Sequence, residues 1–219
     1  MKVRRGLSGG QYRPLTEEDI ARIHETSMRV FAEIGVQVNF AEARELFRHA
    51  GAEVEESSRV VKVPPDLVEG IISKAPSMVT LCGRGENNEL DCEIGGDKVY
   101  MGTGGTALNV QDPGNRDARR SQLKDVMDMA RLVEALDNIH FYMLNVYPND
   151  LPDEDIDVNR FGAALNRTRK HVMGGVYTVE GVRNVIKMAE IFAGSPEKLR
   201  ERPFISMVTC NISPFKLDK

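Results

Sequence analysis

The chain has 219 residues, of which 41% are hydrophobic and 28% charged, an ordinary composition for a globular protein with a sizeable core. Its formal net charge of −4 gives no general attraction to nucleic acid or to an anionic membrane, and no apolar run approaches the roughly 18 residues of a membrane span, so neither partner is expected. The three cysteines include no Cys-x-x-Cys pair, which disfavours disulfides and a structural zinc site. The basic N-terminus lacks the apolar core of a secretory signal. We therefore expect a cytoplasmic location.

The first part of the chain predicts an arm followed by an α-rich region with short strands. Residues 1–14 are expected to be a flexible arm, because glycines and a proline punctuate them. Thr16 has the side chain of a helix N-cap, and Gly35 is placed to end that helix. Further helices are expected over residues 41–50 and from Pro65 up to Pro76. Two strands are then predicted to meet in a β-hairpin through the turn at residues 95–97.

A β-α-β rhythm begins at Val99 and predicts parallel strands joined by crossover helices. Strands are expected to start at Val99, Ile139, Val172 and Phe204, with helices over residues 121–136, 158–169 and 179–193. Such units build either an open doubly wound sheet or half of a TIM (β/α)8 barrel. Central strands of open sheets are near-continuous apolar runs, whereas these strands contain Asn145, Gly174, Gly175 and Thr209. The polar interior favours the barrel.

Four segments carry a family resemblance, in order and over nearly the whole chain. They are FAEIGVQVNFAEARELFRHAGAEVEESSRVVKVPPDLVEGIISKAP, LCGRGENNELDCEIGGDKVYMGTGGTALNVQD, DVMDMARLVEALDNIHFY and NISPFKLD. They resemble the trimethylamine methyltransferase (MttB-like) family of corrinoid-dependent enzymes. The resemblance implies an α/β fold in which an α-rich extension, residues 15–98, precedes a TIM barrel. Because family members are roughly twice this long, residues 99–219 would be the first half of that barrel, with about four βα units.

The resemblance also implies a reaction. Family members transfer a methyl group from a tertiary or quaternary methylamine, such as trimethylamine or glycine betaine, to the Co(I) of a separate corrinoid protein. The cobalamin is therefore expected on that partner and not on this chain. One branch of the family uses a pyrrolysine downstream of residue 219, so these residues do not identify the branch. We expect the full-length form to be a homo-oligomer.

The length of the chain leads to an expectation about its last strand. Residues 204–211 would form an open barrel edge, so this polypeptide alone should be inactive and either poorly stable or associated through that edge. The alternative is a non-catalytic α/β binding module for a small cationic or phosphorylated ligand, complete as it stands. The segment GTGGT at residues 102–106 lacks the spacing of a phosphate-binding loop, and no helix is predicted to follow it. A scaffold that only docks a corrinoid protein is a third option.

A methylated nitrogen is a cation that donates no hydrogen bond, so aromatic faces and carboxylates are expected to hold it. With no tryptophan in the chain, tyrosines are the first candidates. The two-residue strand period places Tyr147 on one face with Asn145. The candidate substrate-binding residues are Tyr147, Tyr177, Asn145, Tyr100, Asn211 and Asp150. The competing interpretation is packing in the barrel interior or loop anchoring, and for Asp150 it is a solvated loop whose acids cap the helix that follows.

Three arginines are the candidates for binding a partner. Arg116, Arg119 and Arg120 precede a predicted helix N-terminus, where the helix dipole disfavours cations. An acidic partner, such as the corrinoid protein, would explain their position, and a turn with surface arginines is the alternative. The four histidines show no metal spacing, and no catalytic dyad or triad is identified, so the catalytic residues remain unassigned and no metal site is expected.

Overall fold

The structure is a computed structural model that describes residues 6–211 and 213–217, and it divides into two compact units. Unit 1 contains residues 6–9 and 78–209; unit 2 contains residues 10–77, 210–211 and 213–217.

Unit 2 is a short-stranded sheet with helices from the α-rich region. Its helices are α1 (Glu17–Arg29), the π-helical η1 (Val30–Ile34), α2 (Ala41–His49) and α3 (Pro65–Ile72). Its strands are β2 (Val36–Val38), β3 (Glu53–Glu55), β4 (Val60–Lys62) and β13 (Lys216–Leu217), in the order β13-β2-β4-β3. The expected ends of the first helix are confirmed. Thr16 and Asp19 form a capping box before α1, and Gly35 takes a φ of 80° after η1.

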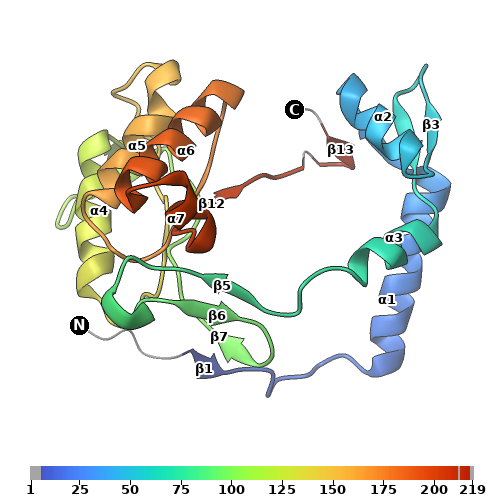
Figure 1. The fold of residues 1–219 in the computed structure, drawn as a ribbon, viewed down its shortest axis with the longest axis horizontal. Coiled ribbons are helices and arrows are strands. Elements are labelled where there is room, and N and C mark those ends of the chain that lie inside the picture. The colour runs from blue at the N-terminus through green and yellow to red at the C-terminus, as the bar shows by residue number, and fades with distance from the viewer. Residues whose placement is uncertain (1–5, 212, 218–219) are drawn as a thin grey trace. The chain divides into compact units, whose positions relative to one another are not determined.

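Unit 1 is built around a parallel sheet of β10 (Tyr142–Met143), β11 (Val172–Gly175) and β12 (Ile205–Val208). Its helices are η2 (Glu86–Asn88), α4 (Leu123–Ala135), η3 (Asp153–Asp155), α5 (Ile156–Leu165), α6 (Val179–Ala193) and α7 (Pro196–Glu201). The crossover helices α4, α5 and α6 lie next to one another, coloured yellow-green to orange in Figure 1. The sheet order follows the chain order. Parallel bridges also join Gly102 to Phe141, just before β10, and Ala107 to Val146, just after it.

The alternation along β10 separates two faces of this sheet. Tyr142, Leu144 and Val146 are buried in the core formed with the helices, while the odd-numbered residues between them are only partly buried. Within the described residues, β12 pairs only with β11 and the strands close no barrel.

Three antiparallel pairs complete unit 1. They are β1 (Leu7–Ser8) with β7 (Lys98–Val99), β5 (Val79–Leu81) with β6 (Cys92–Ile94), and β8 (Asn109–Gln111) with β9 (Ala118–Arg120). These pairs differ from expectation. The strands on either side of the turn at residues 95–97 do not form the expected β-hairpin with each other, because β6 pairs with β5 and β7 pairs with β1. Strand β1 lies within the segment expected to be a flexible arm. This part of the arm is ordered because its backbone groups pair with β7. Arg119 and Arg120 lie in β9, the second strand of the β8–β9 hairpin, whereas Arg116 lies in the exposed bend before it.

A buried lysine ties α4 to the sheet. The Lys170 ammonium group donates to the carbonyl oxygens of Val133, Leu136 and Ile139, at 2.6, 2.7 and 2.6 Å. These carbonyls lie at and just beyond the end of α4, where backbone acceptors lack partners within the helix. The positive charge also complements the negative end of the helix dipole. Lys170 therefore fixes where α4 ends and where the chain turns into β10.

Candidate functional site

Two tyrosines meet where the parallel strands end. Tyr147 follows β10 and Tyr177 follows β11, and their ring centroids lie 5.6 Å apart at an interplanar angle of 73°. The register that pairs Met143 with Met173 leads to this contact when it is continued in steps of two residues along both strands. Tyr177 remains half-exposed, so part of the pair is open to solvent. The structure thus brings together two of the predicted substrate-binding residues.

A buried arginine lies beneath Tyr177. Arg160 lies on the sheet-facing side of α5 and is 0% exposed. Its guanidinium carbon lies 5.6 Å from the centroid of the Tyr177 ring. Its Nη1 donates to the Tyr177 hydroxyl at 3.1 Å, and its Nη2 donates to the Thr106 hydroxyl and the Leu144 carbonyl at 3.2 and 3.1 Å. All three acceptors are neutral. Buried charges are normally paired, so this arrangement is uncommon.

Asp157 fixes the backbone at Tyr177. Its carboxylate is 3% exposed and accepts from the backbone N–H of Tyr177 at 3.1 Å and of Thr178 at 3.4 Å. Thr178 in turn caps α6 through a bond from the Gly181 N–H to its hydroxyl. A Cβ on Gly181 would lie 2.0 Å from the Asp157 carboxylate, so only glycine leaves room for this contact. Helix α5 and the start of α6 therefore hold Tyr177 rigidly from below.

Tyr147 and Asn145 each have a neighbouring partner. The Tyr147 hydroxyl donates to Asp153 at 3.1 Å, and the Tyr142 hydroxyl donates to the Asn145 side-chain oxygen at the same distance. Burial, and after it the bond to Asp153, raises the pKa of Tyr147 above its ordinary value. The phenol therefore stays protonated at neutral pH. Tyr147 and Asn145 lie on the partly buried face of β10 and its extension, as the sequence predicted.

The remaining predicted substrate-binding residues lie elsewhere or have other partners. Tyr100 packs edge-on against His140, which precedes β10, so it is associated with the opposite end of the strand. Asn211 is exposed and belongs to unit 2. The Asp150 carboxylate accepts from the backbone N–H of Leu123 at 2.9 Å, at the start of α4, whereas its alternative interpretation was that it caps the helix that follows it.

The three arginines proposed for partner binding differ in their contacts. Arg119 makes paired bonds to the carboxylates of Asp112 and Asp125, at 2.8–2.9 Å, which lowers the pKa of both acids. Its charge is therefore used inside the chain. Arg120 donates to Asn149 at 3.4 Å, and the Arg116 backbone carbonyl accepts from Gln111. Arg116 and Arg120 are exposed.

The glycine-rich segment at residues 102–106 is bound to the neighbouring strand. The hydroxyls of Thr103 and Thr106 donate to the backbone carbonyls of Met143 and Leu144. These bonds hold the segment beside β10 and place the Thr106 hydroxyl where Arg160 also contacts it. The segment supports the tyrosine site structurally.

Sequence reasoning missed Arg160 and Asp157. A signal was present, because Ile156, Arg160 and Ala164 recur every fourth residue and share one helix face. An arginine in an otherwise apolar stripe marks a buried charge with a specific partner. Asp157 lies in the first turn of α5 and is buried.

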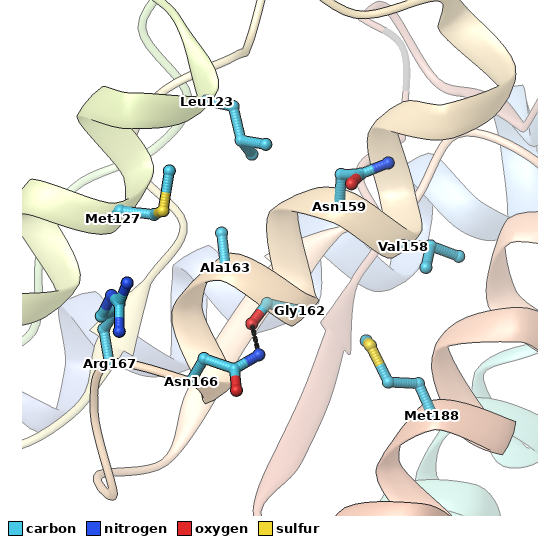
Figure 2. Close-up of a pocket in the computed structure, with 9 residues that line it drawn as sticks. All are labelled: Leu123, Met127, Val158, Asn159, Gly162, Ala163, Asn166, Arg167 and Met188. Carbon is cyan, nitrogen blue, oxygen red and sulfur yellow. Dashed lines mark hydrogen bonds between the residues drawn. The ribbon is translucent and has the colours of Figure 1, made fainter.

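A separate depression lies on the outer side of the helix layer (Figure 2). It has a volume of about 470 Å³ and is lined by residues of α4, α5 and α6 together with Asn166 and Arg167, which follow α5. Figure 2 shows Met127 and Met188 on opposite sides of α5, and the Asn166 side chain bonded to the Gly162 carbonyl. The lining contains no aromatic ring and no carboxylate. Its chemistry does not suit a methylated ammonium group.

No cluster of histidine, cysteine and acidic side chains that could hold a metal ion occurs among the described residues. In the same part of the chain, no helix combines the length and the apolar character needed to span a membrane.

Comparison with known proteins assigns the family. The profile described as trimethylamine methyltransferase (MTTB) matches residues 3–219. The chain is 33% identical over 212 residues to trimethylamine methyltransferase MttB of Desulfitobacterium hafniense (strain DSM 10664 / DCB-2), covering 97% of this chain and 41% of that protein. It is also 33% identical to MttB of Methanosarcina barkeri, covering 96% of this chain and 43% of the relative. Glycine betaine methyltransferase of Desulfitobacterium hafniense (strain Y51) is 29% identical, covering 95% of this chain and 43% of the relative.

Relatives with two different substrates in their names thus match the same stretch of sequence, and this chain spans less than half of the length of each. Because the family profile covers nearly every residue, the chain belongs to the trimethylamine methyltransferase (MTTB) family.

Proposed function

We propose that this chain is the N-terminal part of a cytoplasmic, corrinoid-dependent methyltransferase that demethylates a tertiary or quaternary methylamine. The observation that carries the proposal is the family match over residues 3–219, to relatives named as methyltransferases of trimethylamine and of glycine betaine. The parallel βα units in chain order support a second part of it, that residues 99–219 are the first half of a TIM barrel.

The site at the carboxyl ends of β10 and β11 suits the chemistry. Parallel βα folds bind ligands at that end of the strands. The Tyr147–Tyr177 pair offers an aromatic face to a methylated ammonium group, which cation–π contact favours by about 2 kcal/mol when water is excluded. Asp153 and Asp157 lie against the two tyrosines and add negative charge near the cation. These groups would bind the nitrogen and orient one of its methyl groups outward.

The partner's corrinoid would supply a Co(I) nucleophile that accepts the methyl group. When a quaternary or protonated amine leaves, it keeps the electron pair of the broken C–N bond. This chain therefore need not supply a general acid or base, which agrees with the lack of a recognisable dyad or triad. The role of its residues is to bind, orient and desolvate the ammonium group.

The test uses the full-length protein together with its corrinoid protein. Glycine betaine and trimethylamine are supplied in turn under reducing conditions, and the demethylated amine is measured by NMR. We expect product only when both proteins and one of the two amines are present. If neither amine is demethylated with an active, Co(I)-loaded partner, the proposal is wrong.

A further inference from the structure

The outward face of α5 differs from that of an ordinary surface helix. Six of its ten residues are buried. The other four all line the depression shown in Figure 2: Val158, Asn159, Gly162 and Ala163. None of the four is charged, and only Asn159 is polar. Because the water-facing side of a surface helix normally carries charged and polar residues, we expect another part of a protein to cover α5 in the native assembly.

The two neighbouring helices have the ordinary pattern. Lys124 and Arg131 are exposed on α4, and Arg183 and Lys187 are exposed on α6. Both helices contact α5 within the same layer (Figure 1) and form the sides of the depression. The segment that covers α5 must therefore come from outside this layer.

An apolar projection lies beside the depression. Gly162 and Ala163 leave space between Met127 and Met188, which lie on opposite sides of α5 in Figure 2. One helical turn beyond Met188, and therefore on the same side of α6, Ile191 is 80% exposed. A two-fold axis brings the same patch of two copies together. The recess of each copy can then receive the Ile191 side chain of the other.

The charges on this surface are complementary in the same way. Arg167 is exposed and lines the depression, and Glu190 directly precedes Ile191. Neither forms an ion pair with another described residue. When Ile191 of one copy enters the depression of the other, Glu190 comes close to the rim where Arg167 lies. The two-fold axis forms this ion pair twice.

We propose that the outer face of α4, α5 and α6 is an interface between two copies of this chain. Ile191 of each copy fills the depression of the other, and Glu190 of each copy pairs with Arg167 of the other. The inference goes beyond the proposed function and does not depend on methyl transfer. It gives the homo-oligomer expected from the sequence a specific surface.

The test is sedimentation velocity of the full-length protein over a concentration series, which gives the dissociation constant of the dimer. Ile191→Asp places a charge in both depressions and removes the apolar burial twice, so it should raise this constant at least about 100-fold. Val179→Asp is the matched control. Val179 is a 70% exposed residue at the opposite end of the same helix, and its replacement should change the constant less than about twofold. Circular dichroism checks that both variants are folded.

A charge exchange tests the ion pair. Arg167→Glu and Glu190→Arg each remove two ion pairs and should each raise the dissociation constant about tenfold. The double variant restores opposite charges and should return the constant to within about threefold of the wild type. A role of either residue within one copy would not produce this rescue.

Three results would overturn the inference. The first is a monomeric full-length protein, which would leave the depression to a different protein. The second is a dissociation constant that Ile191→Asp does not change. The third is a double variant that dimerises as weakly as the two single charge variants.

Discussion

Gly181→Ala is expected to disrupt the support of Tyr177. The added Cβ would lie 2.0 Å from the nearer Asp157 carboxylate oxygen and 2.8 Å from the carboxylate carbon, whereas ordinary contact begins at 3.4 Å. Asp157 would have to move by more than an ångström. Its bonds to the Tyr177 and Thr178 amides would then lengthen or break.

The size of the effect follows from these contacts. Stripping the partners from a buried charge costs about 3–5 kcal/mol. Replacing glycine by alanine within a helix returns about 0.4–1 kcal/mol. We therefore expect the free energy of unfolding to fall by about 2–4 kcal/mol, and glycine betaine affinity to fall because Tyr177 is no longer held.

Urea denaturation followed by circular dichroism measures the change, with Gly70→Ala as the matched control. Gly70 also lies in a helix, α3, but a Cβ there would meet nothing within 4 Å. The control should be neutral or stabilising by up to about 1 kcal/mol. Equal unfolding free energies for the two variants would refute the reasoning, because the contact with Asp157 would then impose no cost.

Two further predictions concern buried basic residues of unit 1. Lys170→Met removes three hydrogen bonds to carbonyls at the end of α4 and should lower the unfolding free energy by about 3 kcal/mol. Its control, Lys187→Met on the exposed face of α6, should change the unfolding free energy by less than about 0.5 kcal/mol. Equal urea midpoints for the two variants would contradict this prediction. Burial lowers the pKa of His171. Below about pH 6.5 the unfolded chain therefore binds a proton at this residue that the folded chain does not. The free energy of unfolding should then fall on acidification by up to about 1.4 kcal/mol per pH unit. Denaturation at pH 7.5 and 5.5 should show a smaller pH dependence in His171→Gln than in the wild type, and an unchanged dependence would exclude His171 as its source.

Local signals predicted the helices well. The helix expected over residues 179–193 is confirmed as α6 (Val179–Ala193), because its N-cap Thr178 and the glycine after it act within a few residues. The short helix α7 was missed, although Ser195 and Pro196 are a typical N-cap and first helical residue. Strand lengths were less predictable, because the hydrogen-bonded pairing of a strand depends on residues far away in the sequence. The strand expected to start at Ile139, for example, is regularly paired only at β10 (Tyr142–Met143).

The candidate site was predictable where strand periodicity applied. The two-residue period placed Tyr147 and Asn145 on one strand face, and the parallel register then brought Tyr147 to Tyr177. Arg160 and Asp157 could not be paired with Tyr177 from the sequence, because their contact depends on how α5 packs on the sheet. Asp150 and Arg119 are satisfied within the chain, Asp150 by the N-terminus of α4 and Arg119 by two aspartates.

The central claim is that the methylated nitrogen binds to the tyrosine pair at the carboxyl ends of β10 and β11. The most direct measurement is kcat/KM for the proposed methyl transfer, with the full-length protein and the corrinoid protein proposed as its partner, in Tyr147→Leu and in Tyr100→Leu. Tyr147→Leu removes one ring of the pair and should lower kcat/KM by about 30-fold, the equivalent of about 2 kcal/mol of cation–π contact. Tyr100→Leu removes a ring that packs on His140 and should lower it less than about threefold in a folded variant. Equal losses in the two variants, or an unchanged rate in Tyr147→Leu, would contradict the account.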